Sequence, residues 1–302
     1  MRRLRLAVRR AWLAALAAGL LAFPKPAGAA GKTGASFLKI APTAQSTILN
    51  MAGIREDGSS ILMNPGALSR VSQQMLCATY APYLLDSNYS FMAYTYPTGL
   101  WNISGSFVRL GMGSIEGRAA DRSRTGSFSA EDASFGVALS RDGWGAHLKF
   151  VRQTIGEYSA QGAAVDLGWH SDLRPGIPLV TGLAVRNLGP KMRFLDEGFD
   201  LPTSVEASLA YPFAGSMFLA FAASRELHQN ETQFTVGTQY QVADLLFLRA
   251  GYAVAAGAGA SRQPYPAAGL GLRLGQHSLD YAFMPFQDLG TVHKISFSLR
   301  FK

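Results

Sequence analysis

Hydrophobic and polar residues alternate along most of the chain from Gln74 onward. The last segment shows the pattern most clearly, because Ile295, Phe297 and Leu299 occupy every second position while lysine, serine and arginine residues lie between them. A period of two residues is typical of a β-strand with one apolar and one polar face. The segments are about 8 to 12 residues long, which is the length that a tilted strand needs to cross a bilayer.

About fourteen such strands are predicted, and the connections between them alternate in length. Long connections follow the odd-numbered strands and short ones follow the even-numbered strands, which is typical of an up-and-down antiparallel β-barrel in an outer membrane. A soluble β-sandwich would also alternate, but it would not sort its connections in this way. The predicted strands cover residues 74–80, 89–97, 101–111, 131–141, 144–155, 161–170, 178–187, 203–212, 216–226, 232–242, 245–255, 267–274, 277–286 and 292–301.

The apolar face of each strand predicts which side chains contact lipid. Three segments keep an unbroken apolar phase, and a spanning barrel turns that phase outward. The residues predicted to face lipid in these segments are Leu167, Trp169, Leu270, Leu272, Phe297 and Leu299.

The region before the first strand divides into two parts. Residues 1–29 combine five arginines, an apolar run and a small-residue site at Ala27-Gly28-Ala29, which predicts a cleaved signal peptide and export to the bacterial outer membrane. Residues 30–73 do not alternate and contain the loop signal Asn64-Pro65. A barrel of about fourteen strands encloses more space than its own side chains fill. We therefore predict that residues 30–73 form a plug inside a barrel of residues 74–302.

Charge and composition exclude several functional classes. The signal peptide region holds six of the 28 basic residues and no acidic one, so the mature chain has a net charge of about +2 and no basic surface for nucleic acid. The five histidines are scattered, and no Gly-x-Ser-x-Gly sequence is present. The single cysteine, Cys77, cannot form an internal disulfide. We predict no enzyme activity, no cofactor and no metal site.

Ionisable residues on the non-apolar face of the strands should point into the lumen, because a charge at mid-membrane depth is costly when it faces lipid. Counting from the last turn places Asp280 opposite Ser298, near Arg300 or Arg273. Two interpretations remain open: cross-strand pairs that stabilise the wall, or a polar path for a solute. The predicted lumen-facing residues are Lys149, Asp166, Glu206, Arg249, Arg273, Asp280, Lys294 and Arg300, with Asp166 expected near Lys149.

The third strand breaks its own pattern. Phe107 keeps the apolar phase, but Val108 takes the opposite phase and Arg109 falls where lipid would be. A bulge or kink near Gly105 to Val108 would return Arg109 to the lumen. On its own, such a kink would adjust barrel curvature.

Several longer segments carry a family resemblance. They are residues 34–40, 56–65, 184–194 with Asn-Leu-Gly-Pro, 280–290 with Asp-Tyr-Ala-Phe, and 293–301. Together they resemble the PorV/PorQ family of outer-membrane barrels, which is related in architecture to the FadL long-chain fatty acid channel. The resemblance implies a fourteen-stranded barrel with an N-terminal plug. For the best-known members it also implies a role in type IX secretion.

Two functions follow as hypotheses. The first is a non-enzymatic PorV-like export protein, in which secreted cargo or secretion-system proteins contact the long loops 112–130 and 188–202. The second is a FadL-like channel for hydrophobic small molecules. The resemblance to FadL implies that a kink in the third strand would then open a lateral exit for apolar solutes. Outer-membrane lipid is an expected partner in both.

Overall fold

The structure is a computed structural model that describes residues 33–51, 56–118, 123–174, 177–213, 215–257, 265–286 and 289–301. The predicted signal peptide, residues 1–29, lies outside the described residues. Within them, no helix has the length and apolar character needed to cross a membrane.

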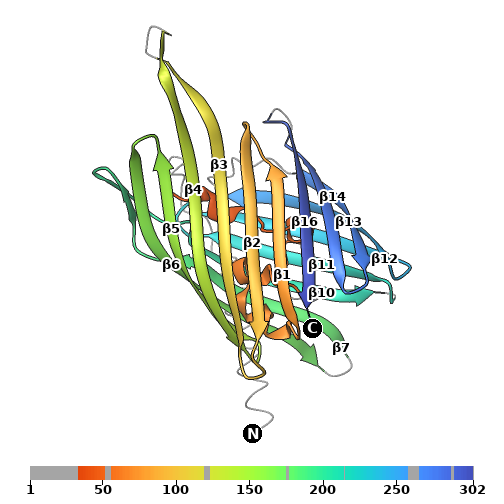
Figure 1. The fold of residues 1–302 in the computed structure, drawn as a ribbon. Helices are drawn as coiled ribbons and strands as arrows, with labels where there is room; N and C mark the ends of the chain where they lie inside the picture. The colour runs from red at the N-terminus through yellow and green to blue at the C-terminus, as the bar shows by residue number, and fades with distance from the viewer. Residues whose placement is uncertain are drawn as a thin grey trace.

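Fourteen antiparallel strands close into one barrel, as the alternating pattern predicts (Figure 1). The strands are β1 (Gln74–Pro82), β2 (Ser87–Pro97), β3 (Asn102–Arg118), β4 (Arg124–Arg141), β5 (Trp144–Ile155), β6 (Tyr158–Arg174), β7 (Ile177–Leu188), β10 (Ser204–Phe213), β11 (Met217–Glu226), β12 (Glu231–Val242), β13 (Leu246–Gly257), β14 (Tyr265–Leu274), β15 (His277–Pro285) and β16 (Thr291–Phe301). Each barrel strand pairs with the next one, and β1 closes the barrel on β16.

Two predicted loops are ordered differently from the expectation. Residues 112–130 are largely a continuation of β3 and β4, which stay paired as far as Arg118 and Arg124 and rise above the other strands (Figure 1). Residues 188–202 contain a separate hairpin of β8 (Met192–Phe194) and β9 (Glu197–Phe199). Neither segment has an apolar phase long enough to be recognised as a strand from the sequence.

Side chains alternate between the lumen and the outside along the strands. In β16, Val292, Lys294 and Ser296 are buried, while the intervening residues are exposed. The six residues predicted to face lipid lie on the outer side, five of them exposed and Trp169 half-buried. Bulky aromatic residues also lie on the outer side beside the short turns, in the place of an interfacial girdle. These residues are Tyr96, Trp101, Trp144, Trp169, Tyr211 and Tyr240.

The outward phase of β14 gives a depth-dependent prediction. Leu270 lies in the middle of the outward face, whereas Leu274 is the last residue of β14, beside a short turn. We expect Leu270→Arg to lower the free energy of unfolding by about 2 to 4 kcal/mol, and Leu274→Arg by about 0 to 1 kcal/mol. Heat-modifiable gel mobility during urea unfolding measures this difference. Equal losses for the two variants would contradict the assigned lipid-facing phase.

The predicted kink in β3 is wrong. β3 pairs with β2 in one register from Ser87–Met112 to Pro97–Asn102, and its register with β4 first shifts beyond Met112. Val108 is buried in the lumen, as its phase requires, and Arg109 stays on the outer side in an ion pair with Glu131 at 2.6 Å.

Arg109 needs no bulge because the apolar band ends below it. The residues beside it in the same row are Ser90 on β2 and Ala133 on β4, whereas the row below holds Met92, Phe107 and Phe135. Arg109 therefore lies at the edge of the apolar band, nearer the long connections. A charge at that depth is tolerated far better than one at mid-bilayer.

Candidate functional site: the plugged lumen

Residues 33–51 and 56–73, which we call the plug, lie inside the barrel (Figure 1). The plug elements are η1 (Ser36–Lys39), α2 (Ala44–Leu49), α3 (Ser60–Met63) and η2 (Pro65–Arg70). Thr43 and Ser46 form a reciprocal capping box that starts α2. Asn64 starts η2, because its side chain accepts a hydrogen bond from the Gly66 amide and Pro65 occupies the first helical position.

The plug motif Asn64-Pro65 rests on a glycine surface made by β5, β6 and β7. Asn64 Nδ2 donates to the Trp169 carbonyl at 2.9 Å. A Cβ atom added at Gly168 would overlap Asn64 Oδ1, and one added at Gly145 would overlap the Pro65 backbone. These strand glycines therefore make room for the close approach of the plug.

Helix α2 rests on a second glycine surface, on β12, β13 and β14. Added Cβ atoms at Gly251 and Gly269 would overlap the backbone and side chain of Ile48, respectively. Lys294 on β16 holds the same helix, because its Nζ donates to Ala41 O at 2.6 Å and to Thr47 Oγ1 at 2.9 Å. The plug is thus fixed to opposite walls of the barrel by shape and by hydrogen bonds.

The first group of predicted lumen residues forms a buried network. Lys149 Nζ lies 2.7 Å from Asp166 Oδ1, and His147 Nδ1 lies 3.0 Å from Asp166 Oδ2. The backbone amide of Asn187 donates to Asp166 Oδ1 at 2.7 Å, and the side-chain oxygen of Asn187 accepts a hydrogen bond from Lys149. The β6–β7 register shifts between Val165 and Leu167, so Asp166 sits at a bulge that Asn187 closes.

Sequence reasoning did not single out His147 or Asn187. The two residues lie on different strands, so no spacing along the chain brings them together. A partial signal existed for Asn187, since it belongs to the Asn-Leu-Gly-Pro segment of the family resemblance.

Ser106, His147 and Asp166 are connected in the same order as the serine, histidine and aspartate of a hydrolytic triad. The Ser106 Oγ lies 3.2 Å from His147 Nε2, on the side of the ring opposite Asp166. The ring crosses β4 over Gly136, and the backbone of Ile61 in the plug also hydrogen-bonds it. The backbone amides of β3 to β6 around it belong to regular ladders, so they form no oxyanion hole. We interpret the arrangement as a tie between strands and plug.

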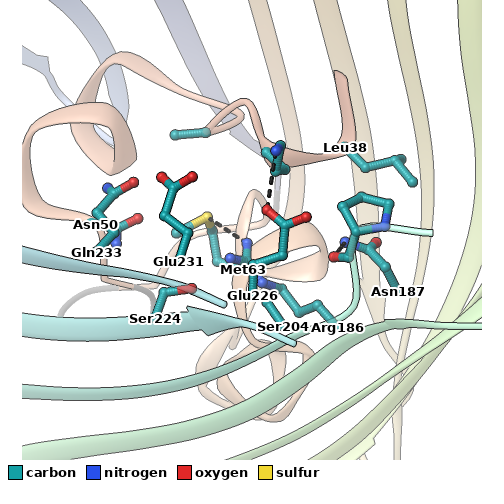
Figure 2. A pocket seen from close by; sticks show the side chains of 13 residues that line it. Leu38, Asn50, Met63, Arg186, Asn187, Ser204, Ser224, Glu226, Glu231 and Gln233 are labelled. Atoms are coloured by element: carbon teal, nitrogen blue, oxygen red, sulfur yellow. Dashed lines mark hydrogen bonds and ion pairs between the residues drawn. The ribbon is translucent and has the colours of Figure 1, made fainter. Parts of the chain in front are cut away.

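A small cavity of about 50 Å³ separates the plug from β7 and β10 to β12 (Figure 2). Glu226 and Glu231 face it from the wall, and Lys39 of the plug pairs with Glu226 at 3.0 Å. On the same wall, Arg186 pairs with the predicted lumen residue Glu206 at 3.0 Å.

The second group of predicted lumen residues surrounds another cavity of about 50 Å³, between the plug and β13 to β16. Asp280 pairs with Arg249, which also donates through Nε to Gln239 at 2.6 Å. Arg273 lies over the Phe247 ring, with its guanidinium carbon 4.9 Å from the ring centroid. Arg300, the eighth predicted lumen residue, donates to the Glu56 carbonyl of the plug at 3.1 Å.

The predicted register of Asp280 is wrong, and its ion-pair partner is Arg249, although Arg273 and Arg300 line the same cavity. Asp280 lies opposite Ser296 rather than Ser298, because the hairpin closes at Pro285–Thr291 and is centred one residue earlier than the sequence suggested. Asp280 and Arg249 meet over Gly271 on β14, which depends on the pairing of β13, β14 and β15, and Arg300 pairs with the plug.

Asp57 of the plug also lines this cavity. Burial raises the pKa of its carboxyl, and hydrogen bonds from the Ser59 amide and hydroxyl oppose that rise. Its Oδ1 also accepts from Cys77 Sγ at 3.8 Å. Among the described residues, no cluster of histidine, cysteine and carboxylate groups could hold a metal ion.

Comparison with known proteins places this architecture. No family model matches the chain, and no curated protein matches it. A deltaS2S3 mutant of the TodX monoaromatic hydrocarbon channel is similar over 86% of this chain and 99% of its own, with a TM-score of 0.64 and 12% identity. The P. putida toluene transporter TodX is similar over 81% and 94%, with a TM-score of 0.53 and 13% identity.

The fold is that of the TodX channels. At 12–13% identity the likeness extends to the fold alone. The resemblance of residues 184–194 and 280–290 to the PorV/PorQ family stays a prediction.

Proposed function

We propose that this barrel is an outer-membrane channel, closed by its plug, that passes small hydrophobic molecules. One observation carries the proposal: part of the inner wall is apolar where it meets the plug. Tyr89, Phe91, Val108, Met284 and Val292 point inward and are almost fully buried, in the half of the barrel nearer the long connections. The interior of a barrel for polar solutes is typically polar instead. The TodX-like fold agrees with this assignment.

The plug must move for such passage to occur. The two cavities beside it hold about 50 Å³ each, whereas an apolar cavity that accepts a benzene-sized molecule measures about 150 Å³. The polar contacts that hold the plug to the wall, such as Lys39 with Glu226 and Arg300 with Glu56, would have to break and reform during passage. We assign the apolar inner wall as the surface that receives the solute once the plug shifts.

The export hypothesis has less support from the two long loops. Of the two loops expected to contact cargo, the first continues as paired strands. The second turns inward, with Met192 and Leu201 buried and Met192 packed against Gly162 on β6. Secreted cargo and secretion-system partners stay a prediction from the family resemblance. Export through the signal peptide stays a prediction from the sequence of residues 1–29.

A disulfide between the plug and the wall tests the proposal. Gly58 lies in the plug, and a Cβ atom added there would be 3.2 Å from the sulfur of the native Cys77 on β1. Disulfide geometry places each Cβ about 3 Å from the opposite sulfur. We expect Gly58→Cys to form this disulfide on oxidation and to lower uptake of a fluorescent naphthylamine dye to the level of cells without the barrel. A reductant should restore uptake.

The matched control is the double variant Gly58→Cys with Cys77→Ser, which carries the same plug change but cannot form the bond. Its uptake should equal that of the wild-type chain under both conditions. Wild-type uptake by the fully oxidised single variant would refute a moving plug. No dye uptake above background by the wild-type chain would refute the channel itself.

A further inference from the structure

The outer surface of β2 to β6 carries an apolar groove that the channel function does not use. Its volume is about 700 Å³, and outward side chains of Tyr94, Phe107, Val137 and Leu148 line it. The groove exists because Gly105 leaves a gap in the outward row. An added Cβ at Gly105 would have no atom within 4 Å. The glycine that suggested a kink from the sequence therefore opens a recess in the lipid-facing wall.

Two arginines lie in the row directly above this groove. Arg109 follows Phe107 on the outward face of β3, and Arg152 follows Phe150 on β5. Ala133 is the register neighbour of both, so the two backbone positions are two strands apart, about 10 Å. The residue between the two positions, Ala133, has a short side chain.

The polar partners of the two arginines differ. Arg109 pairs with Glu131 at 2.6 Å, and its guanidinium lies over Gly111, one row further from the groove. Arg152 is exposed, and it has no hydrogen-bond or ion-pair partner within the part of the chain that the structure describes. With Glu131 included, this rim keeps one net positive charge. A guanidinium group without a partner at the edge of an apolar band fits an anion held at the membrane interface.

We propose that this groove and rim bind a phosphorylated, acylated glycolipid of the outer leaflet, with the chemistry of lipid A. An acyl chain would lie in the groove over Gly105, and a phosphate would lie between Arg109 and Arg152. The leaflet follows from the topology. The arginine row is on the side of the long connections, which face the exterior in outer-membrane barrels. The inference concerns the lipid-facing wall and does not depend on what the lumen passes.

Lipid retained during purification tests the site. The full chain is extracted from native outer membranes in mild detergent, and bound lipid A is quantified by native mass spectrometry. We expect the wild-type barrel to retain lipid A. Gly105→Leu, which fills the groove, and Arg152→Gln, which removes the unpartnered charge, should each lower retention by about tenfold. Heat-modifiable gel mobility selects the folded fraction for every variant.

A matched control and a competitor separate the possible occupants. Ala146→Leu adds the same side chain to the outward face of β5, below the groove, and should retain lipid A like the wild type. An excess of phosphatidylglycerol should not displace lipid A. The proposal is overturned if the wild type carries no lipid A, or if phosphatidylglycerol displaces it. It also fails if Gly105→Leu and Arg152→Gln retain as much as Ala146→Leu.

Discussion

Replacing Asp166 by alanine is expected to lower the free energy of unfolding of the barrel by about 3 to 5 kcal/mol. The Asp166 carboxylate is fully buried and accepts from three donors, namely Lys149 Nζ, His147 Nδ1 and the Asn187 amide. Alanine would leave the Lys149 charge buried without its counter-ion. It would also leave the Asn187 amide without its acceptor at the β6–β7 bulge. Urea unfolding in lipid vesicles, followed by heat-modifiable gel mobility, measures the loss.

Two control variants test whether the loss comes from leaving Lys149 buried without its counter-ion. The double variant Lys149→Met with Asp166→Leu removes both charges, and we expect it to recover most of the loss because well-packed apolar residues can replace a buried ion pair. Glu116→Ala breaks an ion pair with Arg124, whose side chain is 77% exposed, and should change stability by less than about 1 kcal/mol. A loss for Asp166→Ala no larger than that of Glu116→Ala would refute the importance of the network.

The barrel itself was predictable because alternation is a local property. Each strand carries its own apolar phase, so the outward positions of Leu270 and Phe297 follow from the sequence without knowledge of the neighbouring strands. Connection lengths then predict the up-and-down order. The ends of β3 and β4 were not predictable in the same way, because their extensions beyond Met112 and Ala130 leave the apolar band.

Partners inside the lumen were harder to predict, since they depend on register between strands. The last hairpin is centred one residue earlier than predicted, which places Asp280 opposite Ser296 rather than Ser298. Its ion pair with Arg249 reaches across β14, so it depends on two further strand pairings. The Asp166 and Lys149 positions were less sensitive, because a short Asp-Gly turn between β4 and β5 and close pairing of β5 with β6 leave little freedom. The Arg109 error has another cause, since depth in the membrane cannot be read from phase alone.

The roles of the strand glycines could also be predicted only in part from the sequence. Gly105, Gly168 and Gly251 all stand inside strands, where glycine weakens a sheet. Gly168 and Gly251 face the plug, whereas Gly105 faces open space on the lipid side. Phase separates the outward glycine from the inward ones, but only the position of the plug explains why two inward strand positions cannot carry a side chain.

The plug should lose its contact with the wall of β5 and β6 when Gly168 is replaced by valine. The added Cβ would overlap Asn64 Oδ1 and lie 2.8 Å from the Gly66 amide nitrogen, and a clash with backbone cannot be relieved by changing a rotamer. The barrel strands keep their own ladder hydrogen bonds, so the barrel should still close while η2 moves away from the wall of β5 and β6. We expect trypsin cleavage after Arg70 in η2, and a conductance in planar bilayers that the wild-type chain lacks.

Gly113→Val is the matched control for this variant, because an added Cβ at Gly113 on β3 would meet no atom within 4 Å. It makes the same change of residue type within a strand and should leave both the conductance and the trypsin pattern of the wild-type chain unchanged. If Gly168→Val stays closed and resists trypsin while folding normally, then the glycine surface under Asn64 and Pro65 does not hold the plug. If both variants open the barrel, the cause would be strand flexibility rather than the fit between plug and wall.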